Sequence, residues 1–193
     1  MYKKQMTLQR ITSFLLLAAA ALVFVYSLGI STDLYRGLYI ISGYKPTQSN
    51  YVEGAMIYRN MHDFNTNLTT AGIILIVSAA ILFLFRAHDR RRYYVGNYIT
   101  IGINAVLNIG VTIWALINVF EYKAQFLQID FVKLAEVADK KDIFYTESTF
   151  WFDISLAVFI PLLLVTALSI FNVIFKICLM KSERKLLEEG KEA

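Results

Sequence analysis

Four long runs of apolar residues, separated by polar stretches, dominate the chain. A helix rises 1.5 Å per residue, so crossing about 30 Å of hydrocarbon takes about 20 apolar residues. The pattern therefore predicts an all-α integral membrane protein in which four transmembrane helices form a bundle. The predicted spans are residues 11–30, about 69–85, 95–120 and about 149–179.

The first and second runs need separate interpretation. Lys3, Lys4 and Arg10 precede the first run, as basic residues precede the core of a signal peptide. This run is 20 residues long and carries its alanines in the middle, so we interpret it as a retained anchor. The second run has only about 17 residues and is expected to cross with little tilt.

Lysine and arginine are unevenly distributed. Twelve of the 19 lie in 1–10, 86–94 and 176–193, with Lys176 counted in the tail, and seven lie in the longer 31–69 and 121–148. Positive residues favour cytoplasmic loops, so we expect a multi-pass protein of the cell membrane with both termini in the cytoplasm. The prediction is one domain, 1–193, with outer loops 31–68 and 121–148, a cytoplasmic turn 86–94 and a cytoplasmic tail 180–193.

Both outer loops are expected to be partly helical. In the first, Asp33 is placed to cap a short helix, and a second helix is predicted from Asn50 with Glu53 as its capping-box partner. Its five tyrosines suit either a membrane interface or a protein contact surface. In the second loop, an amphipathic helix either continues the third span or lies on the membrane surface. Its apolar side comprises Ala124, Leu127, Phe131, Leu134 and Ala138.

The third span carries a polar stripe. Asn104 and Asn108 lie on one helix face with three further polar residues, and amides in hydrocarbon need hydrogen-bonding partners. The stripe is expected to pack against protein or to line a water-filled pathway. Its residues are Asn97, Thr100, Asn104, Asn108 and Thr112.

Gly102 and Gly110 project from roughly the opposite face of the same span, where a second backbone could approach closely. If both faces are packed, this helix has neighbours on two sides. The neighbour at the glycines is then either a partner subunit or another span of this chain.

Asp153 is the one acidic residue inside a predicted span, which makes it a candidate proton or ion site. It is also shallow and lies beside Phe150 and Trp151, so a structural role at the interface is the preferred alternative. Pro161 removes a helical hydrogen bond, and we expect a kink in the outer half of the fourth helix.

Three further features have two interpretations each. Arg90, Arg91 and Arg92 either contact anionic lipid or, as we prefer, fix the orientation. Asn67 is the first residue of an N-glycosylation pattern. We treat this match as chance and expect Asn67 to lie near the start of a helix. Cys178 has no partner for an intrachain disulfide, and we prefer a buried apolar role to that of a palmitoylated thiol beside the membrane.

Composition narrows the function classes. The chain is 57% hydrophobic and 18% charged with a net charge of +4, which excludes a disordered protein and a nucleic-acid-binding domain. His62 and His88 are expected on opposite sides of the membrane, and no catalytic motif occurs. We therefore expect no enzyme activity, no metal and no cofactor.

The order of spans and loops resembles that of tetraspan proteins such as claudins, although their paired loop cysteines and tryptophan motif are absent. This resemblance implies topology alone. The leading hypothesis is an accessory or scaffolding subunit of a larger membrane complex such as a transporter, with other membrane proteins bound through the third span and the outer loops. The alternative is a small transporter or channel lined by the polar stripe.

Overall fold

The computed structural model describes residues 2–35, 51–85, 95–139 and 145–189, and every regular element in these ranges is helical. Four helices are long and apolar enough to cross a membrane, which confirms the predicted number of spans. The elements are α1 (Tyr2–Gly29), the π-helix η1 (Ile30–Tyr35), α3 (Ile57–Phe85), α4 (Val95–Phe126), α5 (Phe131–Asp139), α6 (Phe150–Asp153) and α7 (Ser155–Glu189).

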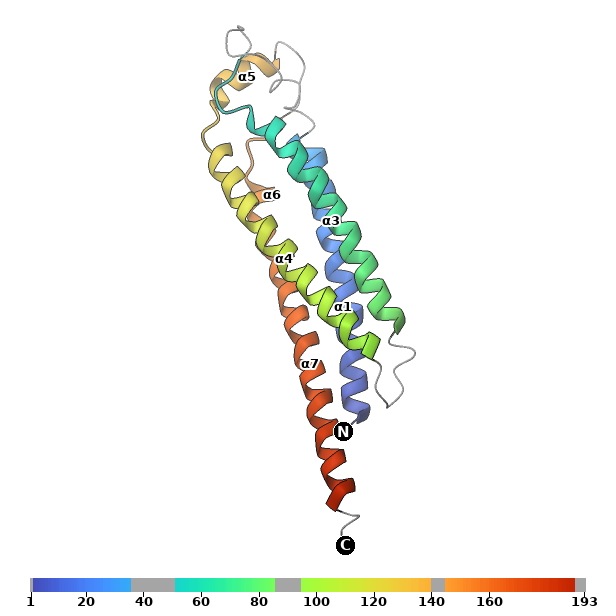
Figure 1. The fold of residues 1–193 in the computed structure, drawn as a ribbon. Coiled ribbons are helices and arrows are strands. Elements are labelled where there is room, and N and C mark those ends of the chain that lie inside the picture. Colours follow the sequence, from blue (N-terminus) through green and yellow to red (C-terminus); the bar gives the residue numbers. More distant parts are fainter. Residues whose placement is uncertain (1, 36–50, 86–94, 140–144, 190–193) are drawn as a thin grey trace.

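The four long helices form a closed ring of antiparallel neighbours (Figure 1). α1 packs against α3 and α7, and α4 packs against the same two helices from the opposite side. The start of α1 and the end of α7 lie together at one end of the bundle, which we call the terminal end. The short helix α5 lies at the other end, which we call the α5 end.

The interior changes character along the bundle. Toward the α5 end it is mostly apolar, with buried side chains such as Tyr26 on α1, Leu68 on α3, Val119 on α4 and Phe159 on α7. Toward the terminal end, buried polar side chains become frequent on α1, α4 and α7, whereas α3 keeps Leu75, Ala79 and Leu82 inside. In a bilayer, where the lipid tails are as apolar as the core, such a polar interior needs internal partners.

The backbones of α1 and α3 approach each other closely at Gly72. A Cβ added to Gly72 would lie 3.0 Å from the Cα of Phe24, so this glycine lets the two helices touch backbone to backbone. Small residues at transmembrane helix contacts commonly serve this purpose.

The helix that contains the second predicted span extends well beyond it. α3 begins at Ile57 and has 29 residues, whereas the predicted span starts near Thr69. The additional turns are amphipathic: Met61 and Phe64 are buried, while Asn67 is exposed in mid-helix instead of lying near a helix start. Such turns contain polar residues, so they fall outside a span that is defined by uninterrupted apolar residues.

The helices predicted for the first outer loop also differ. The chain makes a turn at Glu53 and α3 begins only at Ile57, so Glu53 does not serve the predicted capping box; Asn50 lies outside the described residues. The backbone of Asp33 belongs to η1, which continues α1 directly, and most of the short helix predicted after it lies outside the described residues.

The predicted amphipathic helix of the second outer loop is divided in two. α4 continues to Phe126, a turn follows, and α5 begins at Phe131. Leu134 and Ala138 are buried as expected, whereas Ala124 and Leu127 are exposed, because the turn changes the direction of the chain between them.

The fourth helix is interrupted before the predicted kink site. α6 ends at Asp153, and α7 begins at Ser155 and contains Pro161 in its second turn. The helix then runs to Glu189, so the tail does extend it as expected. Cys178 is exposed on this helix, not buried.

Candidate functional site: the polar half of the bundle

The predicted stripe of α4 lies inside the bundle. Asn104, Asn108 and Thr112 are each at most 2% exposed. Asn104 donates its amide N–H to Ser78 Oγ on α3 at 2.8 Å. Asn108 donates to Asn104 Oδ1 at 3.0 Å and to Thr166 Oγ1 on α7 at 2.9 Å. The two asparagines therefore connect α3, α4 and α7 through side chains alone.

The ends of the stripe differ from its centre. Thr100 is half-buried, and the side chain of Asn97 lies outside the described part of the chain. Thr112 Oγ1 is buried and has no hydrogen-bond partner among the described residues. Arg90, Arg91 and Arg92 also lie outside the described residues.

A second layer of polar contacts joins α1 to α7. Gln5 donates to Gln9 Oε1 at 3.1 Å and to Asn172 Oδ1 at 3.4 Å, and all three side chains are buried. The Nε2 atom of Gln9 has no partner among the described residues. Thr12 and Ser13 are buried one turn further along α1, where their hydroxyls donate to carbonyls of their own helix.

The layer nearest the terminal end contains a buried lysine. Lys176 on α7 is only 7% exposed, and its Nζ lies 5.6 Å from the centroid of the Tyr98 ring on α4. The count of basic residues placed Lys176 with the cytoplasmic residues 176–193, whereas its side chain lies inside the bundle. A lysine over an aromatic face is stabilised by the ring quadrupole, more strongly where water is excluded.

We name these residues the polar core. From the α5 end to the terminal end the order is a threonine and asparagine layer, a glutamine and asparagine layer, and the lysine with its tyrosine. Its members are Gln5, Gln9, Thr12, Ser13, Ser78, Tyr98, Asn104, Asn108, Thr112, Thr166, Ser169, Asn172 and Lys176.

The predicted stripe contained residues of α4 alone, so the α1 and α7 members of the polar core were not predicted, nor were Ser78 and Tyr98. A signal was available on α7, where Thr166, Ser169, Asn172 and Lys176 follow one another at spacings of three, three and four residues. That is the period of one helix face. On α1 the buried amides precede the apolar run, so a search for continuous apolar residues places them outside the membrane.

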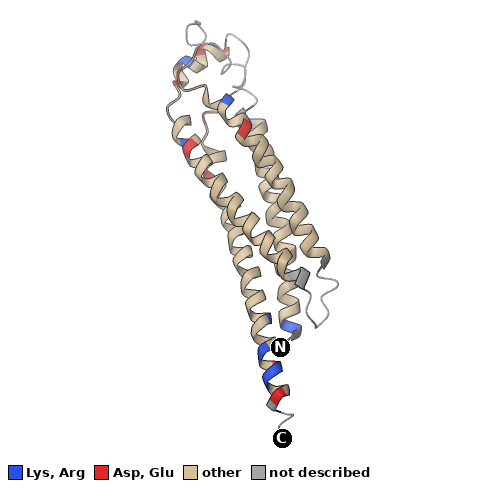
Figure 2. Cartoon of the chain, viewed as in Figure 1, with Lys and Arg blue, Asp and Glu red and all other residues tan. Residues whose placement is uncertain are grey.

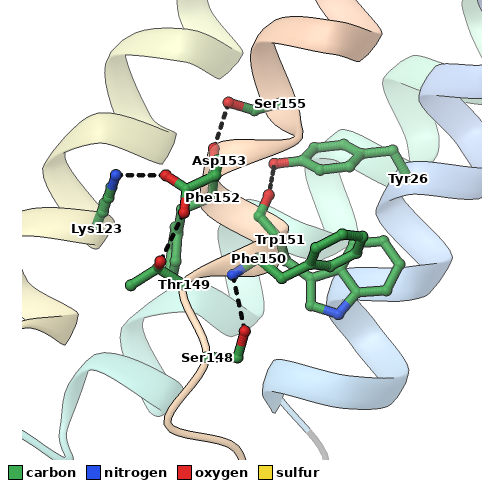
Figure 3. Close-up of polar contacts among 9 residues, drawn as sticks. All are labelled: Tyr26, Lys123, Ser148, Thr149, Phe150, Trp151, Phe152, Asp153 and Ser155. Atoms are coloured by element: carbon green, nitrogen blue, oxygen red, sulfur yellow. Dashed lines mark hydrogen bonds and ion pairs between the residues drawn. The ribbon is translucent and has the colours of Figure 1, made fainter.

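Asp153 lies at the other end, where α4 meets α6 (Figure 3). Its Oδ1 pairs with Lys123 Nζ on α4, and its Oδ2 accepts a hydrogen bond from Thr149 Oγ1 at 2.6 Å. The side chains of Lys123 and Asp153 are 33% and 52% exposed, so the pair is at the surface. Both carboxylate oxygens are engaged, an arrangement that holds α6 against α4.

Aromatic packing completes the junction at α6. Tyr26 on α1 donates its hydroxyl to the carbonyl of Trp151 at 2.9 Å (Figure 3). Gly29 leaves the room that the Trp151 ring occupies, since a Cβ there would lie 2.0 Å from a ring atom. The start of the fourth span is thus fastened to α1 and to α4.

Gly102 and Gly110 face open space on the outside of α4. An added Cβ at Gly102 or Gly110 would meet nothing within 4 Å. Gly110 instead lies in a shallow apolar groove of about 330 Å³ on the outside of the bundle. The groove is lined by Val106, Leu107, Gly110, Val111 and Trp114. Close approach to a partner at these glycines stays a prediction.

Within the described ranges, no group of three or more His, Cys, Asp or Glu side chains could hold a metal ion. His62 is exposed on α3, and His88 lies outside the described residues. Comparison with protein-family models, with curated proteins and with solved structures finds no match for this chain. The assignment of function therefore rests on the geometry of the bundle.

Proposed function

We propose that this chain is a non-catalytic membrane protein that serves as an accessory or scaffolding subunit of a larger membrane complex such as a transporter. The observation that carries the proposal is the asymmetry of α4. On its polar face, Asn104 and Asn108 hydrogen-bond with α3 and α7 of the same chain, whereas its opposite face is apolar, carries two glycines and has an open groove at Gly110.

That open face fits a transmembrane helix of another protein. Glycine permits two helix axes to approach closely, and association inside lipid depends on such packing because the hydrophobic effect does not distinguish helix from lipid. The same proposal places both termini in the cytoplasm of a cell-membrane protein, in agreement with the excess of basic residues at the terminal end.

The test is the mass of the protein purified in mild detergent from the cells that make it. We expect a complex heavier than the 22.1 kDa chain. Gly110→Leu fills the groove and should release the free chain. Ala167→Leu, a similar enlargement at an exposed position of α7, should leave the complex intact. A wild-type protein that is a clean monomer contradicts the proposal.

The proposed orientation has its own test. In a Cys178→Ser background, Glu53→Cys at the α5 end and Lys185→Cys on the tail of α7 both place a thiol at an exposed position. An impermeant thiol reagent should label Glu53→Cys in intact cells and Lys185→Cys only after lysis. The reverse pattern would invert the orientation.

The second candidate function is a small transporter or channel whose pathway follows the polar core. The buried Lys176 favours it, because an ionisable side chain within an apolar helix commonly marks a substrate or ion path. In the Cys178→Ser background, Asn104→Cys or Asn108→Cys should then react with water-soluble thiol reagents. Ala115→Cys in the apolar half is the matched buried control. Equal protection of all three positions favours packing over a pathway.

A further inference from the structure

A cavity opens between the first turns of α4 and the end of α7, next to the polar core but outside it. Its volume is about 330 Å³, and it is lined by Tyr98, Ile177, Met180, Lys181 and Arg184. Tyr98 closes it on the α4 side, where its hydroxyl lies 3.6 Å from the sulfur of Met180. The cavity thus combines an apolar floor with two basic side chains at its rim.

The position of this cavity corresponds to the boundary between hydrocarbon and headgroups. Ile174 and Ile177 are exposed apolar residues just before it, at 53% and 40%. Immediately after it, α7 becomes charged from Lys181 onward. Figure 2 shows basic residues on this stretch of α7 and at the start of α1, below helices that carry few charges. The cavity therefore has exposed apolar side chains on one side and charged side chains on the other, as expected at the edge of a bilayer.

The charge around the cavity favours an anion. Lys181 and Arg184 line it, and Lys176 is buried one turn closer to the bilayer centre beside Tyr98. Arg184 pairs through Nε with Glu188 at 2.9 Å, but both side chains are more than half exposed and a guanidinium has five N–H donors. Such an exposed pair is weak and leaves terminal N–H groups for a second acceptor.

We propose that this cavity binds an anionic glycerophospholipid, with Lys181 and Arg184 contacting the phosphate and an acyl chain lying along Ile177 and Ile174. Basic pockets between transmembrane helices recognise phospholipid headgroups in this way. A phospholipid is favoured over free phosphate because the floor of the cavity is apolar and continues into the lipid-facing surface. This inference does not depend on the accessory-subunit proposal.

The experiment is a titration of the purified full chain in neutral detergent with dioleoylphosphatidylglycerol, with dioleoylphosphatidylcholine and, separately, with inorganic phosphate. Bound lipid is counted by native mass spectrometry. We expect preferential retention of phosphatidylglycerol by the wild type and no competition by millimolar phosphate. The Lys181→Gln/Arg184→Gln variant should bind phosphatidylglycerol roughly tenfold more weakly, because two phosphate contacts are lost.

The matched control is Lys4→Gln/Lys185→Gln, which removes the same charge from exposed positions that do not line the cavity. It should retain wild-type binding, and Lys181→Arg/Arg184→Lys should retain the preference for phosphatidylglycerol. The proposal is overturned if the control loses as much affinity as the cavity variant, if the cavity variant binds normally, or if phosphate displaces the lipid. Circular dichroism verifies that each variant keeps its helices.

Discussion

Asn108 on α4 donates a hydrogen bond to Thr166 on α7, 58 residues later in the chain, at 2.9 Å. Thr166 in turn donates to the carbonyl of Leu162 in its own helix. The contact therefore links a side-chain pair to the backbone of a second helix, at the level where the interior changes from apolar to polar. Both side chains are buried inside the bundle.

Asn108→Leu should lower the stability of the bundle. The change removes the amide that donates to both Asn104 and Thr166, and interhelical hydrogen bonds in membranes contribute about 0.6 to 2 kcal/mol each. We expect a loss of about 1–2 kcal/mol in unfolding by SDS in mixed micelles, followed by circular dichroism. Asn118→Leu is the control, because that amide donates to the carbonyl of Trp114 in its own helix. Equal losses in both variants would mean that the interhelical bond adds nothing.

Gly72→Ala should separate α1 from α3. The new methyl group would lie 3.0 Å from the Cα of Phe24, and a backbone atom cannot move aside as a flexible side chain can. Overpacking of this kind costs about 1–3 kcal/mol. Gly102→Ala adds the same methyl group to open space and should be neutral or stabilising, because alanine favours a helix by about 1 kcal/mol over glycine. The comparison uses the same SDS titration; a reversed order of the two stabilities would contradict the observed packing.

Gly54→Ala should loosen the α5 end of the molecule. Gly54 has a φ of +82°, which alanine rarely adopts, and an added Cβ would lie 3.0 Å from the Cα of Ile129. The neighbouring carbonyl of Glu53 accepts a hydrogen bond from the Asp130 N–H at 3.3 Å, which connects the turn before α3 to the turn before α5. We expect faster amide hydrogen exchange in residues 127–139.

Gly54→Asn distinguishes strain from lost space. Asparagine tolerates positive φ better than alanine does but is larger. If strain dominates, exchange in Gly54→Asn should lie closer to wild type than exchange in Gly54→Ala. If crowding at Ile129 dominates, Gly54→Asn should be the faster of the two.

The Lys123–Asp153 pair should contribute little to stability, yet the effects of substituting its two residues should depend on each other. Both side chains are partly exposed, and ion pairs at the surface are screened by salt. Lys123→Met, Asp153→Asn and the double variant form a cycle measured by thermal unfolding at low and high salt. The effects of the single variants should be non-additive at low salt, and this non-additivity should diminish as salt rises. Additive effects at both salt concentrations would show that the two charges do not interact.

Sequence reasoning succeeded where a single physical requirement governs the chain. Four apolar runs long enough to cross a bilayer became four such helices, because a backbone in lipid must satisfy its own hydrogen bonds. The burial of Asn104 and Asn108 likewise follows from the cost of an amide facing lipid. The positions of their partners, Ser78 and Thr166, depend on how the helices pack, which one-dimensional periodicity does not specify.

The errors have a common physical origin. Gln5 and Gln9 belong to the bundle although they precede the first apolar run, and α3 begins 12 residues before the predicted second span. In both cases an amphipathic helix continues beyond the apolar run, buried on one face by its neighbours. Lys176 is a different case, because it lies inside the predicted fourth span and is buried beside the Tyr98 ring of α4.

The contact between Gln5 and Asn172 can form only late in the synthesis of the chain. The two residues are separated by 167 positions, so the amides of α1 enter the bilayer long before the face of α7 that meets them has been made. At about 5–20 residues per second, ribosomes need roughly ten to thirty seconds to close that gap. During this interval the polar face of α1 is available to other helices or to the insertion machinery, and the arrival of the last helix ends that exposure.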